Sequence, residues 1–193
     1  MFKRLSEDII FLLIKNKKLD IESYDIYLYA IEVILLNGSI LLVCLVMSIL
    51  LGELSHMLAF ILFFIPLRML VGGYHCKKSE LCFICSLGMY GLSMFVMRYT
   101  EIPYVNMVIQ ILAAVSVIVI IIFSPLIHPN HPLEDYQIRR NKKITYGVIA
   151  VDFVLYAIFY KFNLTMAIRE AIFIIFVAFT FMLGRMEDKK SAL

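Results

Sequence analysis

Charged residues are scarce in this sequence, and their scarcity excludes an ordinary soluble domain. Asp, Glu, Lys and Arg together make up 17% of the 193 residues, whereas 62% are hydrophobic and the mean hydropathy is +0.90. A soluble domain of this size is usually nearer half apolar. The excess lies in long apolar runs, such as 105–124 and 167–183, which suffice to cross a hydrocarbon core of about 30 Å as helices. Because lipid offers the backbone no hydrogen bonds, we expect an all-α, polytopic integral membrane protein.

The sequence also lacks the patterns typical of a disulfide framework, a cleavable signal peptide and a soluble catalytic domain. Its cysteines number only four, and three of them fall within one ten-residue stretch, which is unlike a disulfide framework. Residues 2–25 are interleaved with charged side chains and offer no small-residue cleavage site, so we expect no cleavable signal peptide. No internal repeat is visible, and the segments between the apolar runs are too short for a soluble catalytic domain. Any chemistry is therefore expected to reside in the membrane body.

Six apolar segments predict six transmembrane helices, at roughly 28–51, 55–71, 83–98, 105–124, 144–160 and 167–183. The second and third are at the lower limit for a full crossing. We expect one membrane-embedded domain over 1–193, with an N-terminal segment at 1–25, a bundle at 28–183 and a tail at 184–193. Residues 2–18 predict an amphipathic helix that either lies in the membrane surface or packs against the protein. Its apolar side carries Phe2, Leu5, Ile9, Leu12 and Leu13.

The lysines and arginines indicate the orientation of these spans. If the N-terminus is cytoplasmic and the chain crosses six times, fifteen of the eighteen basic residues fall inside and only Arg98, Lys161 and Arg169 fall outside. Positive residues favour the cytoplasmic side of a membrane. We therefore expect a multi-pass membrane protein with both termini in the cytoplasm.

One short segment, 68–82, combines residues that support covalent chemistry. It holds Arg68, the adjacent Gly72 and Gly73, His75, and Cys82. A Cys–His pair is the minimal equipment for thiolate catalysis, because the imidazole accepts the thiol proton before the sulfur attacks a carbonyl. The two glycines permit a tight backbone path that can aim the histidine at a neighbouring helix. A chance pairing of His and Cys is the alternative at this point.

The same segment resembles the signature of the AgrB (accessory gene regulator B) family, which are membrane cysteine endopeptidases of Gram-positive quorum sensing. The family pattern is an Arg, then Gly-Gly-x-His, then a Cys seven residues after the His, and Arg68, Gly72, Gly73, His75 and Cys82 match it. Residues 124–133 (SPLIHPNHPL) resemble the family's Pro- and Asn-rich cytoplasmic loop, and the basic run 139–143 follows. One departure is the second thiol directly after the histidine, where the family usually has a small residue; this residue is Cys76.

The resemblance implies a concrete activity. Cys82 would be the nucleophile and His75 the general base and then acid, at the cytoplasmic face, with Arg68, Gly72 and Gly73 supporting the site. The substrate would be an AgrD-like propeptide, cleaved through a thioester acyl-enzyme and closed to a thiolactone or lactone. A homodimer in the lipid bilayer is implied, with no cofactor and no nucleic acid. The basic residues of the 139–143 run either anchor the topology or bind an acidic part of the peptide; they are Arg139, Arg140, Lys142 and Lys143.

Other polar residues leave alternatives open. Cys82 and Cys85 form a C-x-x-C pair, but Cys85 falls in an apolar helix where a buried thiol is ordinary, so we expect no metal. Glu80 either orients the histidine or is an exposed loop carboxylate. Ionisable residues in or beside the spans tend to pair or face a polar cavity; these are Glu32, Arg98, Asp152 and Glu170. Asp152, mid-span, supports the rival prediction of a small membrane transporter or exporter.

Overall fold

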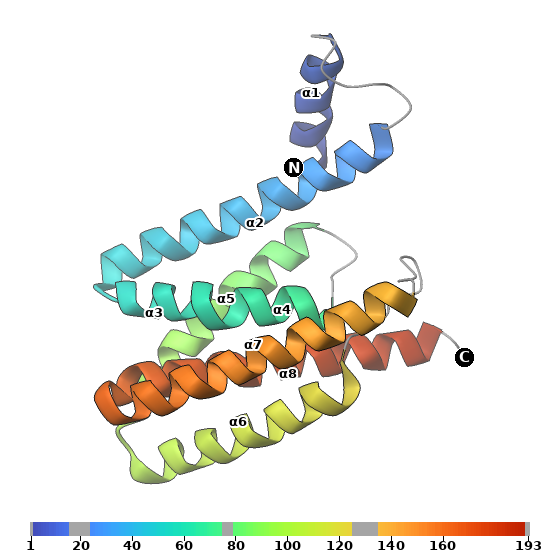
Figure 1. Cartoon of the computed structure of the whole chain (residues 1–193). Coiled ribbons are helices and arrows are strands. Elements are labelled where there is room, and N and C mark those ends of the chain that lie inside the picture. The colour runs from blue at the N-terminus through green and yellow to red at the C-terminus, as the bar shows by residue number, and fades with distance from the viewer. Residues whose placement is uncertain (1, 16–23, 75–78, 125–134, 192–193) are drawn as a thin grey trace. The chain divides into compact units, whose positions relative to one another are not determined.

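The computed structural model describes residues 2–15, 24–74, 79–124 and 135–191 (Figure 1). Every secondary-structure element in these ranges is helical, which confirms the predicted fold class. The elements, in chain order, are α1 (Phe2–Lys15), α2 (Tyr24–Leu51), α3 (Leu54–Ala59), the π-helical η2 (Phe60–Phe64), α4 (Ile65–Val71), α5 (Ser79–Met97), α6 (Pro103–Phe123), α7 (Asp135–Phe162) and α8 (Leu164–Ser191).

Six stretches of the described chain are long and apolar enough to cross a membrane, as predicted. They are Tyr24–Leu51, Leu54–Val71, Ser79–Met97, Pro103–Phe123, Tyr136–Phe162 and Leu164–Glu187. Each helical stretch begins before its apolar run, but only α7 and α8 also end after theirs. The largest difference is in α7, which begins at Asp135 rather than near residue 144. Hydropathy marks where a helix enters lipid, whereas Arg and Lys are good helix formers that continue it outside.

The chain divides into two compact units. Unit 1 comprises Met1–Leu51 and Cys76–Tyr90, and unit 2 comprises Gly52–His75 and Gly91–Leu193. The sequence analysis expected a single domain over 1–193. This stays a prediction, because a division into compact units does not test it. The expected tail at 184–193 is helical through most of its length, because α8 continues to Ser191.

In unit 1, α1 packs against α2. The packed face of α1 includes Phe2 and Ile10, which are buried, and the Phe2 ring lies 5.8 Å from that of Phe83 on α5. Leu5 and Leu12 are exposed instead. The helix therefore packs against the protein, as one of the two sequence interpretations had it, and it also presents an apolar surface outward.

Unit 2 is built around α8, the most buried of the spans. This helix contacts α3, η2, α4, α6 and α7, and Figure 1 shows α6 and α7 running beside it. One of its core clusters joins Leu67 and Val71 of α4 to Ile120 of α6 and to Val177 and Phe181 of α8. The end of α4 is thus fixed to the centre of the unit.

The second span, Leu54–Val71, includes the π-helical turn η2. The rings of Phe60 and Phe64 stack with centroids 4.8 Å apart, and Phe173 of α8 packs against both, at 5.5 Å and 6.1 Å. Pro66 follows within two residues at the start of α4. Proline cannot donate a helical hydrogen bond, and a π turn accommodates such an interruption without ending the helix. The aromatic contacts hold this span on α8.

Candidate active site

The chain leaves α4 through two glycines in conformations that other residues rarely adopt. Gly72 ends the helix with φ 78° and ψ −164°, and its N–H donates to the Arg68 carbonyl at 3.1 Å. Gly73 follows with φ 150°. A side chain at either position would clash with the backbone, at a cost of about 1–3 kcal/mol. The tight path expected from the glycine pair is therefore present.

The Arg68 side chain closes this turn. Its Nη1 donates to the Gly72 carbonyl oxygen at 2.5 Å, and its Nη2 donates to the Tyr74 carbonyl oxygen at 2.6 Å. A cation near the last carbonyls of a helix also interacts favourably with the helix dipole. We refer to Arg68, Gly72, Gly73 and Tyr74 as the Arg68 turn. The guanidinium thus bonds to the backbone of the turn through both of its terminal nitrogens.

Gly73 leaves the space that the guanidinium occupies. A Cβ atom there would lie 1.7 Å from Nη1 and 2.7 Å from Cζ of Arg68, and 3.1 Å from the Thr180 carbonyl oxygen. The Tyr74 N–H donates to that same Thr180 oxygen at 2.9 Å, which fixes the turn to α8. Three residues that the sequence analysis singled out, Arg68, Gly72 and Gly73, therefore form one structure.

The residues after the turn include the predicted base. His75 lies outside the described residues, as do Cys76, Lys77 and Lys78. The chain resumes at Ser79, the first residue of α5, whose hydroxyl donates to the Glu32 carboxylate on α2 in unit 1. Glu32 therefore has a partner, as expected for an ionisable residue in a span.

Cys82 lies in the first turn of α5 as a free, half-buried thiol. Glu80 was expected either to orient the histidine or to be an exposed loop carboxylate. It is exposed, but it lies in the first turn of a helix rather than in a loop. The sequence analysis was wrong about Cys85, which is exposed rather than buried. An apolar sequence alone does not distinguish the core-facing side of a helix from a lipid-facing side. Cys44 on α2 is buried.

The basic run, which the sequence analysis expected either to anchor the topology or to bind the peptide, lies on the first turns of α7. Arg139, Arg140 and Lys143 are exposed, and Lys142 is half-buried with its ammonium 5.9 Å from the Tyr146 ring centre. These side chains form a solvent-accessible cationic surface beyond the apolar part of the helix. The histidine-containing loop at 125–134, which precedes it, lies outside the described residues.

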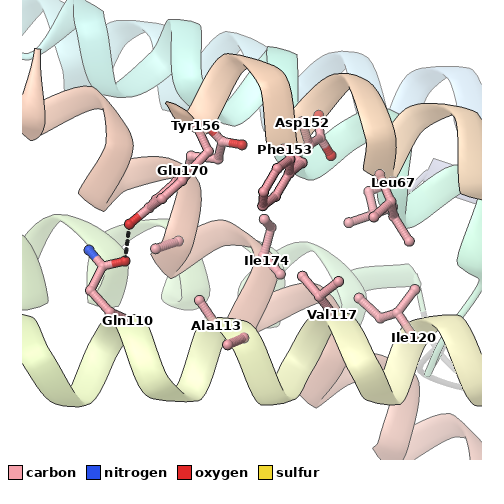
Figure 2. A pocket seen from close by; sticks show the side chains of 13 residues that line it. Leu67, Gln110, Ala113, Val117, Ile120, Asp152, Phe153, Tyr156, Glu170 and Ile174 are labelled. Atoms are coloured by element: carbon pink, nitrogen blue, oxygen red, sulfur yellow. Dashed lines mark hydrogen bonds between the residues drawn. The ribbon is translucent and has the colours of Figure 1, made fainter. Parts of the chain in front are cut away.

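A second polar region lies inside unit 2. A cavity of about 310 Å³ is lined by residues of α4, α6, α7 and α8, among them Asp152 and Glu170 (Figure 2). The sequence analysis expected intramembrane carboxyls to pair or to face a polar cavity, and both of these line a cavity whose wall is mostly apolar. The sequence analysis did not anticipate Gln110 and Tyr156, which join them there, because a single amide or phenol in an apolar run has no distinctive signal.

Sequence reasoning also passed over a buried polar network at the start of the second span. Arg169 of α8 donates to the Glu53 carboxylate at 2.6 Å and to the Ser55 hydroxyl at 2.5 Å. The buried His56 ring lies 2.7 Å, Nε2 to Oγ, from Ser93. A histidine and charged residues within apolar segments were the available signal. These bonds link three segments of unit 2.

The all-helical fold of the described chain and its six apolar spans are those of a polytopic membrane protein. Comparison with known proteins identifies the family. A model of the accessory gene regulator B family matches residues 6–183, and the chain belongs to that family.

Two curated relatives are each 29% identical to this chain over about half of its length. The chain is 29% identical over 98 residues to "Accessory gene regulator protein B" of Staphylococcus carnosus (strain TM300), covering 51% of this chain and 50% of that one. It is 29% identical over 96 residues to the protein of the same name from Staphylococcus saprophyticus, covering 50% and 49%. The chain thus spans about half the length of the curated relatives it matches. No solved structure matches it.

Proposed function

We propose that this protein is a membrane cysteine endopeptidase that processes an AgrD-like quorum-sensing propeptide. The observation that carries the proposal is the Arg68 turn, in a chain that belongs to the accessory gene regulator B family. Three residues of the turn match the family signature: Arg68, Gly72 and Gly73. The Arg68 guanidinium donates to the Gly72 carbonyl oxygen, and Gly73 leaves the space that the guanidinium occupies, immediately before His75. Such strain and close packing cluster at functional sites. The turn is suited to hold the histidine that follows it.

The proposed mechanism begins with proton transfer from the Cys82 thiol to His75. The Cys82 sulfur then attacks the carbonyl carbon of the scissile peptide bond, and His75 returns its proton to the departing amine. The first backbone N–H groups of α5 have no partner within the helix. They are the candidate donors to the oxyanion of the tetrahedral intermediate. The product of this half-reaction is a thioester between Cys82 and the N-terminal part of the peptide.

The second half-reaction closes the ring. A thiol or hydroxyl within the peptide attacks the thioester carbonyl, and the C–S bond to Cys82 breaks as the thiolactone or lactone forms. Transfer from one sulfur to another keeps the acyl group activated, whereas water would hydrolyse it. A site at the bilayer edge that excludes water favours ring closure over hydrolysis.

The surroundings of the site follow from the same proposal. The cationic surface on α7 would bind the acidic C-terminal part of the peptide. The charge distribution supports cytoplasmic termini and a cytoplasmic active site in a bacterial cell membrane. We further propose a homodimer, which photobleaching of single fluorescently tagged molecules in membranes would test by counting two steps rather than one.

Substitution of Cys82 tests the enzymatic proposal. With a candidate propeptide co-expressed, Cys82→Ser and His75→Ala should each abolish cleavage, because one removes the nucleophile and the other its base. Cys85→Ser is the matched control, since Cys85 lies on the same helix and is exposed. Mass analysis should detect a peptide linked to Cys82 in the native protein. Undiminished cleavage by Cys82→Ser in membranes that contain normal amounts of the protein would refute the assignment.

The buried carboxyls of unit 2 favour one second candidate, a small membrane transporter or exporter. Asp152 and Glu170 line a cavity within the spans, and such residues mark ion and substrate paths in many membrane proteins. A transporter should tolerate Cys82→Ser and lose function with Asp152→Asn. A peptidase should show the reverse pattern.

A further inference from the structure

The cavity in unit 2 has a wall that is mostly apolar. Side chains from four helices form it, including Leu67 of α4, Val117 of α6 and Ile174 of α8 (Figure 2). Four polar side chains interrupt this wall: Gln110, Asp152, Tyr156 and Glu170. Two of the four satisfy each other, because the Tyr156 hydroxyl donates to the Gln110 side-chain oxygen. The two carboxyls remain.

Those two carboxyls are buried and incompletely bonded. Asp152 is 5% exposed and Glu170 is fully buried. Oδ2 of Asp152 and both side-chain oxygens of Glu170 have no hydrogen-bond partner among the described residues. Asp152 of α7 and Glu170 of α8 line the same cavity. Arg169, although adjacent to Glu170 in sequence, donates instead to Glu53 and Ser55.

Such an arrangement is costly for a protein unless something compensates it. A buried carboxylate without a partner loses its hydration and gains nothing in return. Replacing both residues by Leu would fill the same space without that cost. A pair of carboxyls that line one cavity avoids this cost either by protonation or by binding a cation.

We propose that this cavity binds a primary ammonium group carried on a short apolar chain. The ammonium offers three N–H donors, and three carboxyl oxygens in the cavity have no partner. The apolar wall accommodates the chain, and the rings of Phe153 and Tyr156 line the same cavity, where aromatic faces attract cations.

Other ligand classes fit this cavity less well. A hard metal ion takes about six to eight oxygen ligands, and the described lining supplies only two carboxyls beyond the engaged Gln110–Tyr156 pair. An anion would be repelled by both carboxylates. A purely apolar ligand would leave their oxygens without partners.

The ligand can reach the cavity from the side. Phe153 lines the cavity and is 73% exposed on the outside of α7, and Ala114 of α6 is exposed likewise. The cavity thus opens on the outer surface of the helices. An amine with an apolar chain and the lysine side chain of a membrane-bound peptide share the required chemistry.

The test is a binding measurement on the whole chain in nanodiscs of phosphatidylcholine and phosphatidylglycerol, whose headgroups lack a primary amine. The probe is n-butylammonium, and 1-butanol is its neutral counterpart. Titration calorimetry should show saturable binding of n-butylammonium and none of 1-butanol. Equal heats from both probes, or no saturable binding of n-butylammonium, would overturn the proposal.

Substitutions locate the binding in the cavity. Asp152→Asn and Glu170→Gln should each weaken binding by about tenfold to a hundredfold, because each removes a charge-assisted hydrogen bond. Ala113→Leu should block the cavity while leaving both carboxyls in place. If a carboxyl variant does not fold, this variant still tests whether the ligand binds in the cavity. Glu101→Gln, an exposed carboxylate outside the cavity, should leave binding unchanged. Native affinity in Asp152→Asn, Glu170→Gln and Ala113→Leu would exclude the site.

A competition experiment distinguishes the two sources of the ammonium. An amphipathic peptide with one lysine should displace n-butylammonium if a peptide side chain is the ligand, and the norleucine version should not. Displacement by neither, with n-butylammonium still bound, assigns the site to free amines. This site does not depend on the peptidase proposal, because binding is read without cleavage and cleavage is tested at Cys82.

Discussion

Substitution of Gly73 by alanine tests the geometry of the Arg68 turn most directly. The added Cβ would lie 1.7 Å from Arg68 Nη1, whereas real Cβ atoms essentially never approach a neighbour within 3.0 Å. The guanidinium or the backbone must therefore shift by more than an ångström. Because Nη1 donates to Gly72 and Nη2 to Tyr74 at 2.5 Å and 2.6 Å, such a shift breaks at least one of these bonds.

The expected size of the effect follows from these contacts. A hydrogen bond from a charged donor contributes about 1.5–3 kcal/mol. Alanine at φ 150° adds about 1–3 kcal/mol of backbone strain. Together they amount to several kcal/mol at the residue two positions before His75. Since about 1.4 kcal/mol corresponds to a factor of ten in rate, we expect propeptide processing to fall by about a hundredfold or more.

The assay is cleavage of a co-expressed, tagged propeptide, normalised to the amount of enzyme in the membrane. Gly88→Ala is the matched control, because a Cβ there meets nothing within 4 Å. Alanine should stabilise that helix by about 0.5–1 kcal/mol. If the clash with the guanidinium contributes, Gly73→Ala should cost less in an Arg68→Ala background than in the native protein, since the double variant removes that clash and leaves only the backbone strain. Native processing by Gly73→Ala, or defects that simply add, would refute the reasoning.

Two further predictions concern ionic groups elsewhere. In the ion pair of Arg169 and Glu53, the Arg169 side chain is 8% exposed and that of Glu53 46%. Glu53→Gln should therefore lower stability in detergent by about 1–2 kcal/mol, because it leaves a buried cation, while Arg169→Met should be nearly neutral. Thermal unfolding followed by circular dichroism would show this, and equal losses from both variants would contradict it. On α7, the double change Arg139→Glu and Lys143→Glu should raise KM for the propeptide without reducing membrane insertion. Lys161→Glu at the other end of α7 is the control, and an unchanged KM would rule out peptide binding by the cationic surface.

The sequence predicted the spans well because lipid imposes a simple rule. A helix that must cross a hydrocarbon layer reads as an apolar run, so all six runs were visible and their number was confirmed. The residues at which the helices begin and end could be predicted less well. The start of α7 at Asp135 is set by hydrogen bonding outside lipid, where charged residues continue a helix freely.

The site was predictable only where residue type is restricted by backbone geometry. Gly72 and Gly73 stood out because adjacent glycines before a histidine indicate an unusual turn, and the structure gives them positive φ. The partners of Arg68 could not be predicted, since both acceptors are backbone carbonyls that every sequence has. The exposed Cys85 was mistaken for a buried residue for a related reason. A lipid-facing side and a core-facing side of a helix have the same composition.

The central place of α8 has a consequence for biosynthesis. The helix that contacts α3, η2, α4, α6 and α7 is the last of the six spans to leave the ribosome. The earlier spans of unit 2 enter the membrane before their common neighbour exists, so their mutual packing can be completed only after translation has passed Leu164–Glu187. Until then the buried faces of α4 and α6 are accessible to lipid or to insertion factors. A ribosome stalled before this point would leave a partial protein whose Tyr74 N–H has no Thr180 carbonyl to bind.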